Sequence, residues 1–168
     1  MTEAFRANLS IEGQEGIATV LSVRGVERLG CPFDYEIVFR CPNVILDDAR
    51  NPTTSLEIND GRFVSGVVHS IRAEVVGAGQ AHQQPKFVAR LRPAPYTRLV
   101  HRYGFRIWQE LDVVDIVKAV LTDAGVADDL VDWAGVSGTY PVRTYTVQYD
   151  EDEWAFVNRL LEEEGIYY

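Results

Sequence analysis

Residues 31–41, Cys-Pro-Phe-Asp-Tyr-Glu-Ile-Val-Phe-Arg-Cys, carry the clearest structural pattern in the chain. One set of alternate positions is apolar: Phe33, Tyr35, Ile37, Phe39 and Cys41. The opposing positions include Asp34, Glu36 and Arg40. Because successive side chains of a β-strand point to opposite faces, this alternation predicts a strand with one buried face.

Similar strand-like runs flank this stretch on both sides. They lie at residues 5–11, 17–26, 54–58, 62–75 and 86–92, and the first alternates strictly from Phe5 to Ile11. Turn signals separate them, such as Asn59-Asp60-Gly61 and Gly77-Ala78-Gly79. Many short strands with no helix between them predict an antiparallel sandwich or barrel, so residues 1–100 are expected to form a β-barrel-like domain.

The pattern changes after Pro93 and Pro95, where helical spacing begins. Asp112 is an expected N-cap for a helix that ends at Gly125. A second helix is predicted over 150–164, with an acidic first turn and Gly165 as its stop. An extended segment is expected at 140–149, and Ile166-Tyr167-Tyr168 is read as the start of a strand. The fold class is therefore α+β, and the chain is expected to be the front part of a longer polypeptide.

Composition narrows the functional classes. The 168 residues are 46% hydrophobic and carry a formal net charge of −9, which opposes non-specific binding to nucleic acid or anionic membrane. The start, MTEAFRANLSIEGQ, lacks the basic and apolar regions of a signal peptide. No apolar run approaches the ~20 residues of a membrane-spanning helix. Synthesis in the cytoplasm and no membrane insertion are expected.

Residues suited to catalysis or metal binding are scattered. Cys31 and Cys41 would be held apart by the predicted strand, so both are expected as buried free thiols. The histidines at 69, 82 and 101 do not have metal-ligand spacing. No Gly-x-Ser-x-Gly elbow or phosphate-binding glycine loop is present. The sequence therefore predicts no enzyme activity, no cofactor and no metal.

Residues 145–168, YTVQYDEDEWAFVNRLLEEEGIYY, resemble the signature block of the VgrG family, the spike proteins of type VI secretion systems. That pattern is an aromatic residue, two spacers, Gln-Tyr, an acidic turn, Phe-Val, Arg-Leu and Glu-Glu-Gly-Ile with an aromatic residue. Weaker similarities lie at 63–68, 91–93, 106–109 and 113–121. The sequence departs at Trp108 and Trp154, where the family usually has Phe and Leu, and at Asp152-Glu153, where it usually has Ser-Asp. Nothing matches the small barrel and needle that follow in whole family members.

The resemblance implies a phage tail hub-like fold and a structural function. Residues 1–100 would be one hub domain, and the helix-containing region 101–168 would start a second one, truncated at its C-terminus. Whole family members form homotrimers at the tip of the secretion tube, contact the tube protein and carry effectors to target cells. A hub or baseplate protein of a contractile phage tail or related injection device remains an alternative, as does a cell-wall hydrolase of a tail device.

Six residues of the block are the candidate site, with a role in packing or at a subunit interface: Gln148, Tyr149, Phe156, Arg159, Glu163 and Gly165. The acids at 150–153 are read as a capping box rather than as a glycosidase carboxylate pair. The acids at 162–164 oppose the helix dipole and are read as a solvated run or as a contact to a partner subunit. The three tryptophans are expected in a core or interface, not in a sugar-binding platform.

Overall fold

A computed structural model describes residues 6–13, 18–42, 52–59, 61–74 and 84–168. The chain divides into two compact units, Met1–Arg28 with Pro32–Pro93, and Leu29–Cys31 with Ala94–Tyr168. Several sequence features lie outside the described residues, namely Phe5, Ile17, Asp60, the glycine turn at 77–79 and His82.

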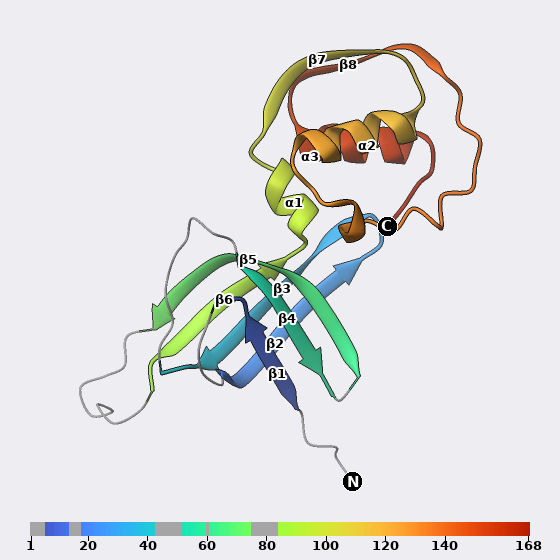
Figure 1. Cartoon of the computed structure of the whole chain (residues 1–168). Helices are drawn as coiled ribbons and strands as arrows, with labels where there is room; N and C mark the ends of the chain where they lie inside the picture. Colours follow the sequence, from blue (N-terminus) through green and yellow to red (C-terminus); the bar gives the residue numbers. More distant parts are fainter. Residues whose placement is uncertain (1–5, 14–17, 43–51, 60, 75–83) are drawn as a thin grey trace. The chain divides into compact units, whose positions relative to one another are not determined.

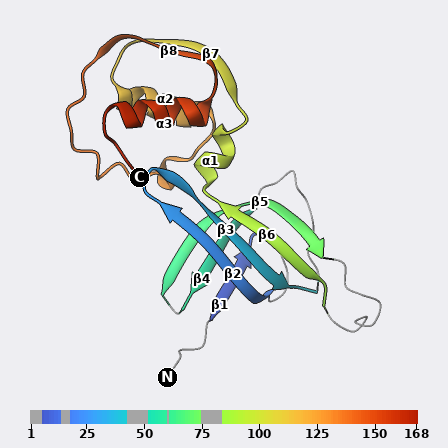
Figure 2. The same cartoon turned by 180° about the vertical axis from the view of Figure 1, so that it is seen from behind.

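The first unit is a closed antiparallel barrel of six strands (Figure 1). Its strands are β1 (Ala7–Ile11), β2 (Ala18–Arg28), β3 (Cys31–Arg40), β4 (Thr53–Ile58), β5 (Arg62–Glu74) and β6 (Lys86–Arg92). Their order around the barrel is β1-β2-β3-β6-β5-β4, and β1 pairs with β4 to close it. Figure 2 shows the side of the barrel that β2, β3 and β6 form. The predicted barrel and the α+β class are confirmed.

The alternation of β3 explains the barrel core. Tyr35, Ile37, Phe39 and Cys41 are buried, as the sequence pattern predicts. Phe39 is the register partner of Phe87 on β6, and their rings stack at 5.7 Å between centroids. Since most inward positions on β4, β5 and β6 are also apolar, with Thr54 the buried polar residue of β4, the barrel interior is filled by side chains.

Gly66 allows two strands to approach closely. A Cβ at this position would lie 2.4 Å from the main-chain oxygen of Arg92 on β6, a distance that no side chain tolerates. The pairing of β5 with β6 then becomes irregular between Val68 and Ser70. Glycine is therefore required here by contact, since its lack of a side chain permits close backbone approach.

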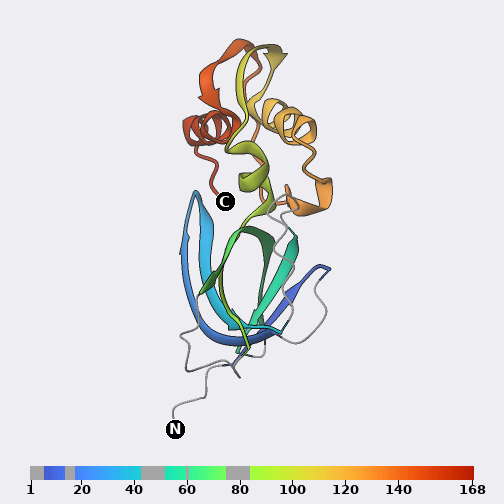
Figure 3. The same ribbon diagram turned by 90° about the vertical axis from the view of Figure 1, so that its left-hand side faces the viewer.

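The second unit is a two-stranded antiparallel ribbon with two main helices on one side. Its elements are α1 (Ala94–Leu99), β7 (Tyr103–Leu111), α2 (Val113–Asp123), the short 3-10 helix η2 (Asp128–Leu130), β8 (Arg143–Asp152) and α3 (Glu153–Glu163). Figure 3 shows α2 and α3 nearly end-on, both on the same side of the β7–β8 ribbon. Apolar side chains of α2 and α3 share one buried core that includes Ile116, Val120, Phe156 and Leu160.

Capping residues set the ends of both helices. Asp112 accepts a hydrogen bond from the Asp115 amide at 2.9 Å, and Asp152 accepts one from the Ala155 amide at 2.8 Å. Gly125 and Gly165 both have positive φ and follow the helix ends. In each case the next residue donates back to the carbonyl five positions earlier, which is the Schellman arrangement. The predicted N-cap at Asp112 and both glycine stops are confirmed.

Three expectations were wrong or incomplete, and two elements were missed. The second helix begins at Glu153, not 150, because the strand β8 continues to Asp152. Ile166–Tyr168 is not a strand. Cys31 is exposed, while Cys41 is buried and both are free thiols. The short helix α1 and the strand β7 were not predicted.

Leu56, which is fully buried in the barrel, tests the core directly. We expect Leu56→Ala to lower the free energy of unfolding of the barrel by about 2–5 kcal/mol, because a cavity replaces the lost side-chain contacts. The control Leu21→Ala removes a leucine that is 44% exposed and should change it by less than about 0.5 kcal/mol. Amide hydrogen exchange of the barrel strands is the measurement, since all three tryptophans lie in the other unit. Equal effects of the two substitutions would contradict this assignment of the core.

Candidate functional site

The signature block of residues 145–168 forms most of β8, all of α3 and the turn after it. β8 pairs with β7, so that Phe105 lies opposite Tyr149 and Arg106 lies opposite Gln148. Because side chains alternate along each strand, the ribbon has two different faces. The inner face points toward the helices, and the outer face does not.

A buried carboxylate organises the inner face. The side chain of Glu153, the first residue of α3, has no exposed surface. Its Oε2 accepts a hydrogen bond from Arg102 Nε at 2.7 Å, and its Oε1 accepts one from Arg106. Both guanidinium groups also pair with Asp123 near the end of α2, at 3.0 and 3.1 Å. Two positive and two negative groups therefore balance within one cluster.

This cluster corrects the expectation for the acids at 150–153. Only Asp152 caps the helix; Glu153 is an ion-pair partner of two arginines. Hydrogen bonding to Glu153 also raises the pKa of Arg102 above its usual value. Since Glu153 has no solvent-accessible surface, it is poorly placed to act on a substrate as a glycosidase carboxylate.

Gln148 is the second buried polar group on this face. It is fully buried, and its Nε2 donates to the carbonyl oxygen of Glu151 at 3.2 Å. Gly104 on β7 leaves room for it, because a Cβ there would lie 3.2 Å from the amide atoms of Gln148. The pairing of β7 with β8 shifts between Gly104 and Phe105. Opposite this shift, Asp150 of β8 adopts a positive φ of 49°.

The acids at the end of α3 are neutralised within the chain. Arg143 of β8 pairs with Glu163 at 2.7 Å and with Glu164 at 2.6 Å. Arg159 pairs with Glu163 at 3.3 Å and with Glu151 at 2.6 Å. Glu163 and Glu164 are thus not a free solvated run, as one reading of the sequence had it. These arginines offset the unfavourable position of acids at a helix C-terminus.

The structure separates the six candidate residues into three settings. Gln148 and Phe156 are buried in the second unit, and Gly165 ends α3. Arg159 and Glu163 form an ion pair at the end of α3, while Tyr149 is 75% exposed on the outer face. A role of these residues at a subunit contact stays a prediction.

The outer face of the ribbon is apolar and exposed. Its exposed large side chains are Tyr103, Phe105 and Ile107 on β7, and Tyr145, Val147 and Tyr149 on β8. The rings of Phe105 and Tyr149 meet edge to face at 5.3 Å. Sequence reasoning missed the β7 half of this surface, although the alternation from Tyr103 to Trp108 could have indicated a strand.

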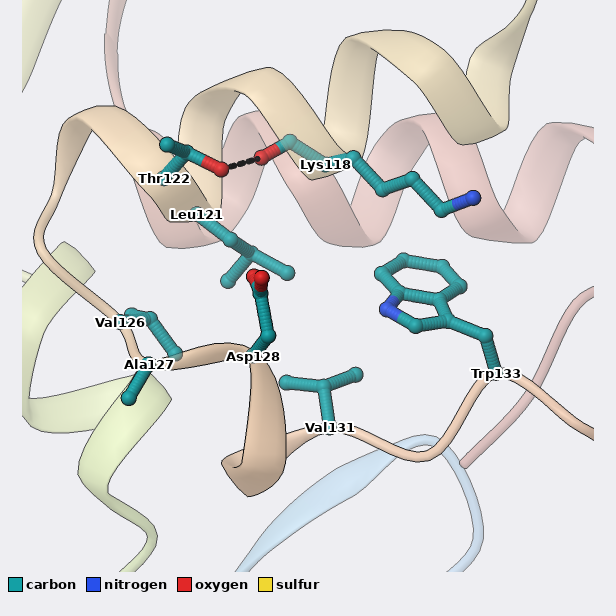
Figure 4. Close-up of a pocket in the computed structure, with 8 residues that line it drawn as sticks. All are labelled: Lys118, Leu121, Thr122, Val126, Ala127, Asp128, Val131 and Trp133. Atoms are coloured by element: carbon teal, nitrogen blue, oxygen red, sulfur yellow. Dashed lines mark hydrogen bonds between the residues drawn. The ribbon is translucent and has the colours of Figure 1, made fainter.

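A separate cavity of about 390 Å³ lies beside α2 (Figure 4). It is lined by Lys118, Leu121, Thr122, Val126, Ala127, Asp128, Val131 and Trp133. The ammonium group of Lys118 lies 5.2 Å from the ring centroid of Trp133, and the hydroxyl of Thr122 donates to the Lys118 carbonyl at 2.9 Å. This lining holds neither a cysteine nor a histidine.

Two further searches are limited to the part of the chain that the structure describes. No group of three or more His, Cys, Asp or Glu side chains there is arranged to hold a metal ion. None of the helices there has the length and apolar content that crossing a bilayer requires.

Comparison with known proteins decides the family. The model of the phage tail baseplate hub (GPD) family matches residues 26–168. The chain belongs to this family. That match covers the ribbon, both helices and most of the barrel.

Relatives point to the type VI branch of these hubs. The chain is 36% identical over 152 residues to the type VI secretion system spike protein VgrG1b of Pseudomonas aeruginosa, which is 87% of this chain and 19% of that protein. It is 33% identical over 164 residues to VgrG5 of the same organism, 96% of this chain and 20% of that protein. The hub-family chain thus spans about a fifth of the length of these curated relatives. The resemblance to the VgrG family is confirmed.

A solved structure supports the fold. The E. coli c3393 protein, described as a component of the type VI secretion system with structural similarity to the T4 bacteriophage tail proteins gp27 and gp5, superposes with a TM-score of 0.78. The match covers 92% of this hub chain and 42% of that chain at 24% sequence identity. The phage tail hub-like fold is confirmed.

Replacing Glu153 tests the buried cluster. We expect Glu153→Gln to lower the free energy of unfolding of the second unit by about 1–3 kcal/mol, because two guanidinium groups then face one carboxylate. The control Glu162→Gln changes an exposed acid of the same helix and should have little effect. Urea unfolding followed by tryptophan fluorescence is the measurement, since Trp108 and Trp154 pack against this core. Equal stability of the two variants would show that the cluster does not stabilise the unit.

Acidification tests the ion pairs of Glu163. Hydrogen bonding to Arg143 lowers the pKa of Glu163 below 4.5. The ion pairs of Glu163 therefore stabilise the folded unit above pH 4.5, and this stabilisation is lost as the pH falls through the lowered pKa. We expect the stability difference between the wild type and Glu163→Gln to be largest above pH 4.5 and to vanish at lower pH. Because the side chain is 41% exposed, salt should reduce this difference. A difference that does not depend on pH would contradict the assignment.

Proposed function

We propose that this chain is a structural hub module of a type VI secretion spike, which assembles through protein–protein contacts as a homotrimer at the tip of the secretion tube. The observation that carries the proposal is the family match over residues 26–168 together with spike-protein relatives at 31–36% identity. The chain spans only about a fifth of the length of those relatives. The activity of a whole spike is therefore proposed, since the match covers only this module.

The proposed function is structural rather than enzymatic, without a cofactor. The acids of the signature block support this view, since Glu151, Glu153, Glu163 and Glu164 are all engaged by arginines of the same unit. Carboxylates held in this way stabilise a fold, whereas a general acid needs access to its substrate.

The finer points of the proposal concern domains, partners and location. Residues 1–100 act as one hub domain, and residues 101–168 begin a second one. The partners are further copies of the chain, the secretion tube protein and spike-associated effectors, with no nucleic acid. The chain is made in the cytoplasm and leaves the cell as part of the type VI apparatus.

A hub of a contractile phage tail or related injection device is the second candidate. The family description and the structural relative's similarity to T4 tail proteins favour it specifically. Because the two machines share the hub fold, the fold alone does not separate them.

Gene disruption separates these candidates. In the bacterium that encodes the chain, we expect its removal to abolish export of the secretion tube protein into the medium while the cytoplasmic amount of that protein stays unchanged. The wild-type gene supplied in trans should restore export. Immunoblots of medium and cells are the measurement.

Two other outcomes would redirect the assignment. Normal export of the tube protein with loss of infectious phage particles would move the chain to the phage tail candidate. Release of soluble fragments from purified peptidoglycan by the purified chain would instead support a cell-wall hydrolase.

A further inference from the structure

The cavity beside α2 has an apolar floor that the fold itself holds in place. Leu121, Val131 and Trp133 line it and pack against the buried core of the second unit. Val126, which also lines it, belongs to that core and is only 7% exposed. The volume of about 390 Å³ lies near the lower end of the roughly 300–1,000 Å³ that is typical of small-molecule sites. The cavity is therefore preformed and suits a small ligand.

The polar groups around this floor form a donor end and an acceptor end. At the donor end, the Lys118 ammonium lies 5.2 Å from the centroid of the Trp133 ring. Figure 4 shows the indole nitrogen of Trp133, which can only donate, on the side of the ring toward Asp128. The acceptor end holds the Asp128 carboxylate and the Thr122 hydroxyl, which donates to the Lys118 carbonyl and so offers a lone pair to a ligand.

The two charges of the cavity are available to a ligand. Elsewhere in this unit, acids and arginines neutralise each other, as Glu163 and Arg143 do at 2.7 Å. Among the residues that the structure describes, neither the Lys118 ammonium nor the Asp128 carboxylate has an ion-pair partner. They do not pair with each other, so more than 4.0 Å separates them. Opposite charges held apart beside one apolar floor are complementary to a molecule that carries both charges.

A ligand with fewer charges fits this arrangement less well. Lys118 would attract a simple anion that Asp128 repels, and a simple cation would meet the reverse. A wholly apolar ligand would displace water from both charged groups without replacing its hydrogen bonds, which is unfavourable. A ligand with one group of each sign satisfies both ends at once.

We propose that this cavity binds a small zwitterion with an apolar side chain, which is the chemistry of a free apolar or aromatic amino acid. The ligand's carboxylate lies against Lys118 and the indole N–H of Trp133, and its ammonium group lies against Asp128 and the Thr122 hydroxyl. Its side chain covers the apolar floor. Binding here is independent of the proposed hub function, because no lining residue belongs to the signature block of residues 145–168.

Three probes that share a phenyl group test this recognition. L-Phenylalanine carries both charges, phenylpropionate carries only the carboxylate, and phenylethylamine carries only the ammonium group. The indole N–H resonance of Trp133 in a proton–nitrogen correlation NMR spectrum is the measurement, with the resonances of Trp108 and Trp154 as internal references. We expect L-phenylalanine to shift the Trp133 resonance saturably and each single-charge probe to bind at least roughly tenfold more weakly, because each lacks one charge-assisted contact. No saturable shift with L-phenylalanine, or equal affinity for all three probes, overturns the proposal.

Two substitutions test the two ends separately. Lys118→Gln should weaken L-phenylalanine and phenylpropionate by at least roughly tenfold and leave phenylethylamine unchanged. Asp128→Asn should weaken L-phenylalanine and phenylethylamine and leave phenylpropionate unchanged. Lys118→Arg keeps the positive charge and should retain binding of all three probes.

Lys86→Gln is the matched control for these substitutions. The chain has two lysines, and Lys86 lies on the barrel strand β6, where it pairs with Glu74 at 2.6 Å. This variant should bind all three probes as the wild type does. Both Lys118 and Asp128 are exposed, so their variants should fold, and circular dichroism verifies that they do. Loss of all probes alike in both cavity variants, or of none in either, overturns the assignment of the two ends.

Discussion

The buried carboxylate of Glu153 is the constraint on which the second unit depends. It joins the first residue of α3 to Arg102 and Arg106, which lie before and within β7. Once Arg106 points inward to reach it, the alternation of the strand places Phe105 and Ile107 outward. A one-residue shift in register would expose Arg106 and bury its apolar neighbours, so the ion pair and the outer face are two results of one register.

The barrel could be predicted from local patterns because its strands follow local rules. Residues 33–41 alternate with a period of two, and the buried positions among them are Tyr35, Ile37, Phe39 and Cys41. Likewise, Asp112 and Gly125 mark the ends of α2 with short-range hydrogen bonds that span only a few residues. In these segments the physical cause and the sequence signal lie within the same stretch of chain.

The setting of the acids could not be read in this way. Glu153 and Arg102 are 51 positions apart in sequence, and the charge pattern near Glu153 alone is that of a helix start. The true cap is Asp152, one residue earlier, since β8 runs to the edge of the helix. Similarly, Arg143 neutralises Glu163 from 20 residues away. Long-range ion pairs leave no periodic trace, so sequence reasoning assigned Glu153 to a capping box and Glu163 to solvent or to a partner subunit.

The interior ion pairs also explain how a thin ribbon can hold a large apolar face in place. An isolated pair of strands is marginally stable in water, and its exposed aromatic side chains would favour collapse or misregister. Here Arg106 of β7 pairs with Glu153 of α3, and Arg159 of α3 pairs with Glu151 of β8. Gln148 donates to the Glu151 carbonyl within β8. Such ion pairs permit few alternative registers, because a shift would leave the buried charge of Glu153 without its arginine partners. The ribbon thus directs Arg106 and Gln148 to its inner face, beside the apolar core of α2 and α3, and presents Phe105 and Tyr149 on its outer face.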